Sequence, residues 1–226
     1  REARRKVALV DLDLFGGDVA TMMNIDVSGP LVDLLEEPDL DPGQVDSYLV
    51  PHISGVRVLP APASLTGGRD IPAARVREVL VLLKHGYDFV VVDAPPVPDA
   101  LLHPVLDEAE IIVLPVVQDL VSVKRTRAIL EWLGTLHLRA EVRLVLNQAG
   151  IENGIKIQDF ERSLGGSFAV RIPWEEKVVR AAANKGQPFA LGHIHSGAAR
   201  SIGELARQLA GTGESAPGWK GPRFRR

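Results

Sequence analysis

The 226-residue sequence contains no cysteine, and only 5% of its residues are aromatic. Without cysteine the chain can form no disulfide, no thiolate nucleophile and no Cys-ligated zinc or iron–sulfur site. No apolar run reaches the ~20 residues of a membrane span. Positive charge is not in excess either, since 26 Lys and Arg stand against 29 Asp and Glu. This balance argues against a generally basic nucleic-acid binder.

Apolar runs separated by helical segments dominate what is present. The runs are nearly continuous in Val, Ile and Leu, which indicates burial on both faces, as in a parallel sheet covered by helices. Helical periodicity lies between them, at 73–85, 121–136 and 196–210. We therefore expect an α/β fold, a doubly wound and mostly parallel sheet with helices on both faces, as one domain over 1–211. The predicted strands cover 7–12, 56–60, 89–93, 110–116, 141–147 and 168–172.

The segment 212–226 differs in composition from the rest of the chain. It is rich in Gly and Pro and ends in Arg225 and Arg226. Such a segment cannot bury enough apolar surface to order itself, so we expect a flexible basic tail.

Acidic side chains follow two of the predicted strands. VALVDLD ends in Asp11 and Asp13, and FVVVD ends in Asp93. Strand alternation would place Asp11 and Asp13 on one side, and open α/β sheets bind ligands beyond the carboxyl ends of their strands. Carboxylates there suit a cation or an activated water. The alternative is a pair of solvated loop acids that cap a following helix.

Two later strand ends carry residues suited to a ligand. LVLNQ contains Asn147, whose amide offers a donor and an acceptor to the edge of a purine base, although a turn asparagine after a strand is favoured when this motif is taken by itself. The strand that ends at Pro173 leads into a helix that begins near Glu175 and stops at Gly186. Helix capping without any function would also explain these acids and this glycine.

In their order and spacing, four segments resemble the MinD/ParA superfamily of P-loop ATPases, and within it the CpaE/TadZ type linked to pilus assembly and cell-pole localisation. The segments are VALVDLDLFGGD, YDFVVVDAPP, LVLNQ and IPWEEKVVRAAANKGQPF. The resemblance implies that Asp13 positions the attacking water, that Asp11 supports the magnesium shell and that Asp93 is the Walker B acid. It also implies that Asn147 reads adenine and that Pro173 begins the loop covering the base.

The superfamily's first strand and its glycine-rich phosphate loop, with the pattern KGGxGKT, do not occur in these 226 residues. REARRK looks like the end of the helix that follows that loop, so we expect the loop to precede Arg1 in a longer parent protein. Residues 1–226 alone are then expected to be inactive, because the loop cradles the phosphates. A degenerate, non-hydrolysing relative is the alternative. In the superfamily the first strand is central, so we expect an empty gap, with no direct pairing between 89–93 and 110–116.

The resemblance implies a Mg- and ATP-dependent dimer switch with slow hydrolysis, which positions or assembles a Tad-type pilus or secretion apparatus. The implied partners are a second copy, joined through bound ATP, and pilus assembly proteins, with peripheral membrane contact. The implied location is the cytoplasm, at the cell pole or the inner face of the membrane. The rivals are a non-hydrolysing scaffold and a ParA-type DNA-partitioning ATPase. A net charge of −3 disfavours DNA, although Lys124, Arg125 and Arg127 form one basic turn.

Overall fold

The computed structural model describes residues 5–14, 16–26, 30–62, 71–94, 99–152 and 154–211. The predicted tail at 212–226 lies outside these residues. The chain divides into two compact units, the first formed by Arg1–Glu108 with Ala183–Pro188 and the second by Ala109–Ala182 with Phe189–Arg226. The expectation of one domain over 1–211 stays a prediction. No helix in the described ranges has both the length and the apolar content needed to cross a bilayer.

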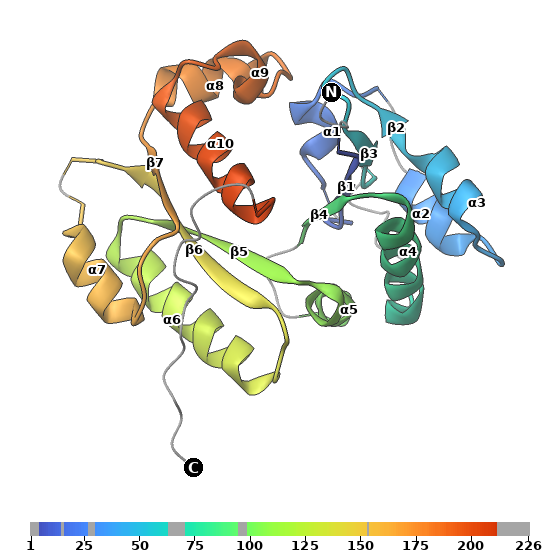
Figure 1. Ribbon diagram of the computed structural model, residues 1–226, viewed down its shortest axis with the longest axis horizontal. Helices are drawn as coiled ribbons and strands as arrows, with labels where there is room; N and C mark the ends of the chain where they lie inside the picture. Colours follow the sequence, from blue (N-terminus) through green and yellow to red (C-terminus); the bar gives the residue numbers. More distant parts are fainter. Residues whose placement is uncertain are drawn as a thin grey trace. The chain divides into compact units, whose positions relative to one another are not determined.

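The first unit contains a four-stranded sheet in the order β2-β3-β1-β4 (Figure 1). β1 pairs in parallel with β3 on one side and with β4 on the other, while β2 pairs antiparallel with β3. The strands are β1 (Val7–Asp11), β2 (Val50–Pro51), β3 (Arg57–Leu59) and β4 (Phe89–Asp93).

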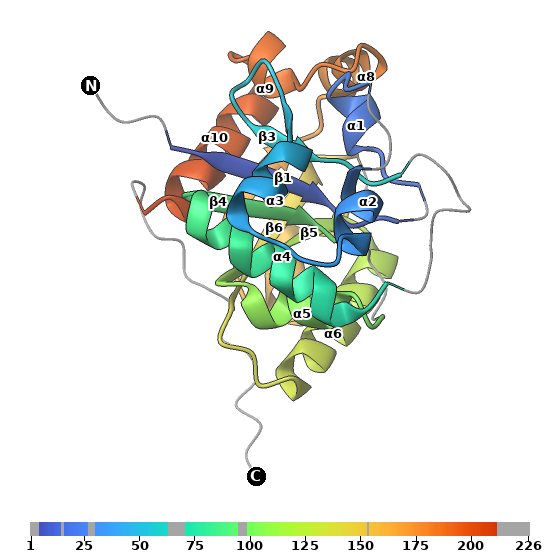
Figure 2. The same ribbon diagram turned by 90° about the vertical axis from the view of Figure 1, so that its right-hand side faces the viewer.

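The helices of the first unit bury apolar side chains. The longest, α4, buries Val76, Val79, Leu80 and Leu83, which is the i, i+3, i+4, i+7 spacing of one helix face. Figure 2 shows α3 and α4 in front of the strands of this sheet. A capping box formed by Asp41 and Gln44 starts α3. The helices are α1 (Val19–Met22), α2 (Pro30–Glu36), α3 (Pro42–Tyr48), α4 (Ala73–Gly86) and α5 (Leu102–Glu108).

The second unit contains a parallel three-stranded sheet in the order β5-β6-β7. Figure 1 shows α6 and α7 on one side of these strands and α10 on the other. Under α10, Leu205 packs against Val145 and Val170. The elements are β5 (Ile111–Val117), α6 (Leu120–Thr135), β6 (Glu141–Ala149), α7 (Ile157–Leu164), β7 (Val170–Pro173), α8 (Glu176–Asn184, which continues into the first unit from Ala183), α9 (Phe189–Gly192) and α10 (Gly197–Leu209).

The predicted fold class is confirmed. Every predicted strand forms, with its ends shifted by no more than two residues, and every strand pairing except that of β2 with β3 is parallel. The helices predicted at 73–85, 121–136 and 196–210 correspond to α4, α6 and α10.

β4 and β5 each lie at the edge of a sheet. Within the described residues, β4 pairs only with β1, and β5 pairs only with β6. Direct pairing of these two strands, which was the alternative to an unfilled gap, is therefore not found in this part of the chain. Val91 of β4 is 51% exposed and Val113 of β5 is 37% exposed. Pro115 lies within β5 and offers no amide hydrogen to a neighbouring strand.

Candidate functional site

Three predicted site residues come together at the carboxyl ends of β1 and β4. The two strands pair in register, so that Asp11 lies opposite Asp93. The N–H of Leu12 extends the ladder by donating to the carbonyl of Asp93 at 2.9 Å. β1 ends at Asp11, so the position of Asp13 follows from a turn and not from strand alternation. Asp11 is 1% exposed, whereas Asp13 is half-buried.

The carboxylate of Asp11 organises the loop between β1 and α1. Its Oδ1 accepts the N–H of Asp13 at 3.1 Å, and its Oδ2 accepts the N–H of Val19, the first residue of α1, at 3.2 Å. Burial raises the pKa of Asp11; these two N–H groups lower it, and the charges of Asp93 and Asp13 raise it again, so that it ends above its ordinary value. The bond to Val19 is of the helix-capping kind that the sequence left open. A role for Asp11 in a magnesium shell stays a prediction.

Gly17 allows this loop to close on Asp11. A Cβ atom at position 17 would lie 2.3 Å from Oδ2 of Asp11 and 2.7 Å from Cβ of Ala61. No other residue fits there unless both the carboxylate of Asp11 and Ala61 move. This role of Gly17 could not be foreseen from the sequence, where its signal is the glycine pair before Asp18.

Carboxylates repel one another at this edge of the sheet. Asp93 is exposed at the end of β4, but neighbouring groups partly desolvate its carboxyl and so raise its pKa, and the charges of Asp13 and Asp18 raise it further. A divalent cation relieves this kind of repulsion, and carboxylate oxygens are the ligands that Mg²⁺ accepts. Among the described residues, no three His, Cys, Asp or Glu side chains form a ready metal cage. The acids therefore fit Mg²⁺ only as part of a shell that water or a bound phosphate completes.

Replacing Asp93 by asparagine should reduce the pH dependence of stability. Because the folded-state pKa of Asp93 is raised, its carboxyl stabilises the fold below its ordinary pKa, and this contribution is lost as pH rises through the raised value. Asparagine does not titrate. We expect the variant to melt at or above the wild-type temperature at pH 7, with the difference vanishing towards about pH 4.

Thermal unfolding followed by circular dichroism at both pH values measures this difference. Asp39→Asn, at an exposed acid of the same unit, is the matched control. The repulsion would be contradicted if the melting temperature of the Asp93→Asn variant fell below that of wild type at pH 7 and the deficit were larger at pH 7 than at pH 4.

In the second unit, Asn147 and Pro173 lie near the carboxyl ends of two paired strands, where Ala149 of β6 pairs with Pro173 of β7. Oδ1 of Asn147 accepts the N–H of Gln148 at 3.0 Å. Gln148 has a φ of 55° and Gly150 a φ of 85°, so the chain turns sharply here. Among the described residues, no hydrogen bond is found for the amide NH₂ of Asn147. The reading of a base by Asn147 stays a prediction.

Two side chains that could not be identified from the sequence, Gln118 and Glu175, hydrogen-bond backbone groups at this end of the sheet. Gln118 is 8% exposed; its Oε1 accepts the N–H of Gly150 at 3.2 Å and its Nε2 donates to the carbonyl of Ile155 at 2.6 Å. Glu175, expected only as an acid near a helix start, accepts N–H groups from the first turn of α10. Gly150 lies 32 residues from Gln118 in the sequence, and Gly197 lies 22 residues from Glu175. A local sequence pattern therefore cannot predict these contacts.

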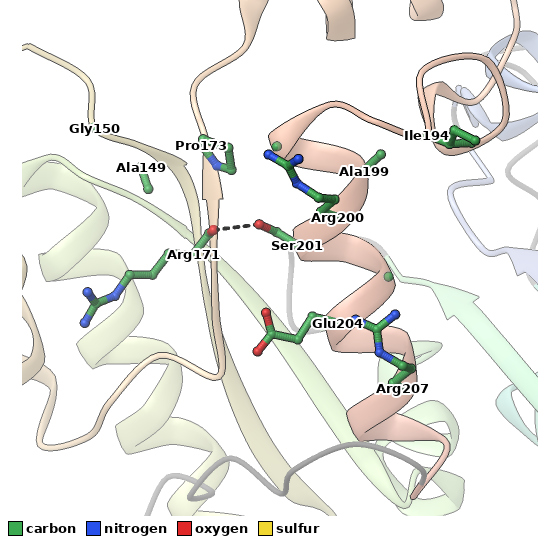
Figure 3. A pocket seen from close by; sticks show the side chains of 12 residues that line it. Ala149, Gly150, Arg171, Pro173, Ile194, Ala199, Arg200, Ser201, Glu204 and Arg207 are labelled. Carbon is green, nitrogen blue, oxygen red and sulfur yellow. Dashed lines mark hydrogen bonds between the residues drawn. The ribbon is translucent and has the colours of Figure 1, made fainter.

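A pocket of about 790 Å³ lies beside Pro173 (Figure 3). Figure 3 shows Arg200 of α10 near Pro173, and the side chain of Arg171 directed away from α10. Arg171 is already paired with Glu161 at 3.1 Å, and its carbonyl accepts the Oγ–H of Ser201 at 3.0 Å. Pro173 thus lines the pocket, as do Ala149, Gly150, Arg171, Ile194, Gly197, Ala199, Arg200, Ser201, Gly203, Glu204 and Arg207.

The sequence has a relative among curated proteins, although no family model matches it. The chain is 26% identical to an uncharacterized ATP-binding protein of Methanocaldococcus jannaschii over 213 aligned residues. The alignment covers 92% of this chain and 77% of that protein.

Solved structures share the fold. A ParA family ATPase from Chlorobium tepidum matches with a TM-score of 0.84 at 22% identity, over 92% of this chain and 87% of that chain. The septum site-determining protein MinD from Pyrococcus horikoshii, complexed with Mg-ADP, matches with a TM-score of 0.77 at 21% identity, over 92% and 85%. The MinC:MinD cell division complex of Aquifex aeolicus gives 0.77 at 21% identity, over 95% and 86%. The chain therefore has the fold of the MinD/ParA P-loop NTPases.

Proposed function

We propose that this protein binds Mg-ATP and hydrolyses it slowly, as a nucleotide-controlled dimer switch. The observation that carries the proposal is the register of β1 and β4, which places Asp11 opposite Asp93 with Asp13 in the next turn. Parallel sheets bind ligands beyond these strand ends. The fold is shared with a ParA family ATPase and with a MinD protein complexed with Mg-ADP, which supports nucleotide as the ligand.

Each acid has a separate part in this proposal. Asp13 orients the attacking water, and its backbone is held by Asp11. Asp11 and Asp93 support the magnesium ion, which when bound neutralises charge on the transferring phosphate. Asn147 and Pro173 bind the adenine base. The helix-capping bonds of Asp11 do not conflict with this part, because a carboxylate oxygen can accept from more than one donor.

The biological role that we propose is the positioning or assembly of a Tad-type pilus or secretion apparatus. It rests on the order of the DLD, DAPP, LVLNQ and IPWEE segments, which resemble the CpaE/TadZ type. A second copy joined through ATP and pilus assembly proteins are the proposed partners. The MinC:MinD complex of Aquifex aeolicus is an example of partner binding by a protein of this fold.

We also propose that the phosphate cradle and a central strand come from a segment outside residues 1–226. The unpaired edges of β4 and β5 support this idea, because strands this apolar in a parallel sheet are normally paired on both sides and covered, whereas Val91 and Val113 are exposed. In the full-length protein such a segment would supply the backbone N–H groups and the lysine that bind phosphates.

Calorimetric titration with Mg-ATP tests both proposals together. We expect the full-length protein to bind, and residues 1–226 to bind at least about tenfold more weakly, because oriented amides and cations dominate anion binding. Equal affinity would contradict the outside cradle. Failure of the full-length protein to bind would contradict the ATP-dependent function itself.

A further inference from the structure

Glu175 joins the end of β7 to the start of α10. Its Oε2 accepts the N–H of Ala198 at 2.8 Å, and its Oε1 accepts the N–H of Gly197 at 3.1 Å. The hydroxyl of Ser196 accepts the N–H of Ala199 at 3.1 Å. Side chains therefore satisfy the N–H groups of the first turn of α10, which no carbonyl within the helix can reach. The two bonds lower the pKa of Glu175, so the carboxylate is the form that binds.

The backbone around Glu175 is fixed as well. The N–H of Trp174 donates to the carbonyl of Ala149 at 3.0 Å, and the carbonyl of Glu175 accepts the N–H of Val178 at 3.1 Å and that of Val179 at 3.0 Å. The turn over 173–175 is thus tied to β6 by its backbone, to α8 by its carbonyl and to α10 by the carboxylate of Glu175.

The contact between this turn and α10 is close. A Cβ atom at Gly197 would lie 2.9 Å from Cγ of Pro173 and 3.3 Å from Oε1 of Glu175. Pro173 and Gly197 both line the pocket beside α10, as does Arg200, whose charge also lowers the pKa of Glu175. The carboxylate of Glu175 therefore sets the separation between the two walls of the pocket at this end.

We infer that Glu175 is a positioning residue for nucleotide recognition, which holds Pro173 in place on the base side before the ligand arrives. The inference rests on the proposed function, because only a nucleotide-binding protein has a base side. Holding a wall of a site in its bound position improves affinity by removing an ordering cost from the binding step. Glu175 contacts only residues on the proposed base side, so its loss should affect ligands that carry a base and spare those that do not.

The test compares two ligands on the full-length protein, Mg-ATP and Mg-tripolyphosphate, by calorimetry. Glu175→Gln keeps the shape of the side chain but turns an NH₂ donor towards an N–H donor, so one bond is lost. We expect about tenfold weaker binding of Mg-ATP, with tripolyphosphate affinity unchanged within about twofold. In turnover, KM for ATP should rise while kcat stays within about twofold.

Glu176→Gln is the matched control, since it removes the same charge one residue away, where the side chain pairs with the exposed Arg180 and makes no bond to α10. It should behave as wild type. Gly197→Ala disturbs the same contact from the α10 side, because its Cβ would press on Pro173 and Glu175. It should reproduce the selective loss of Mg-ATP affinity while Glu175 itself is unchanged.

Equal losses for both ligands would show a general structural effect and overturn the inference, as would unchanged Mg-ATP binding by Glu175→Gln and Gly197→Ala. If wild type binds neither ligand, the proposed function fails and the inference fails with it. Binding by wild type with no selective loss in the variants overturns the inference alone.

Discussion

Replacing Asp13 by alanine is expected to abolish most ATP hydrolysis by the full-length protein while leaving ATP binding and dimerisation largely intact. A group that orients the attacking water acts in the transition state more than in the bound ground state. We therefore expect kcat to fall at least about 100-fold. The loop should keep its shape, because Asp11 holds the backbone N–H of Asp13 and alanine retains that group. Phosphate release at saturating Mg-ATP measures the effect.

Asp93→Ala provides the contrast. Loss of the Asp93 carboxylate should weaken magnesium-dependent ATP binding, so that raising the magnesium concentration partly restores the binding. Turnover that survives Asp13→Ala within a factor of a few would show that Asp13 does not have the role assigned to it. Loss of Mg-ATP binding in Asp13→Ala would place it among the residues that hold the metal.

Replacing Gly17 by alanine should destabilise the first unit by about 2–5 kcal/mol. The new Cβ would lie 2.3 Å from Oδ2 of Asp11, so the carboxylate must move. It then releases the N–H groups of Asp13 and Val19, and the buried acid loses the donors that compensate its burial. Denaturant unfolding followed by circular dichroism measures the loss, and nucleotide binding should decline with it.

Gly86→Ala is the control for this substitution, since a Cβ at Gly86, the last residue of α4, would meet nothing within 4 Å. It should be neutral or stabilise the protein by up to about 1 kcal/mol. The double variant Asp11→Ala with Gly17→Ala should cost less than the sum of the two single changes, because the main clash is with the Asp11 carboxylate. Strict additivity, or wild-type stability of Gly17→Ala, would contradict this account.

The long strands of both sheets could be predicted because their signal is local. Continuous apolar runs such as the one at 89–93 predict parallel strands, and parallel strands form there. The burial on both faces that such a run indicates is not found in β4, where no residue is buried and Val91 is 51% exposed. The short elements could not be predicted. The two-residue strand β2 and the seven-residue helices α2 and α3 are too short for a periodic pattern to stand out from the loops around them. Their formation depends on packing against the longer elements.

Some features of the candidate site could also be predicted from the sequence, and others could not. Asp11 and Asp93 could be placed together because both end strands of one parallel sheet, and the register confirms that they lie opposite each other. The burial of Asp11 could not be foreseen, because it follows from the missing side chain at Gly17 and from the N–H of Val19. Glu175 and Gln118 act on partners distant in the sequence, and only the folded chain brings these together.

The two sheet edges differ in how readily they would recruit a foreign strand. β5 contains Pro115, which cannot donate to an incoming chain and so limits continuous pairing along that edge. β4 reads FVVVD, with four apolar residues, no proline and no lysine, and Val91 is 51% exposed. A segment of this composition at an uncovered edge is a template for intermolecular β-structure. If nothing else pairs with it, β4 is where aggregation of this polypeptide would begin, and a lysine at Val91 would act as a gatekeeper against it.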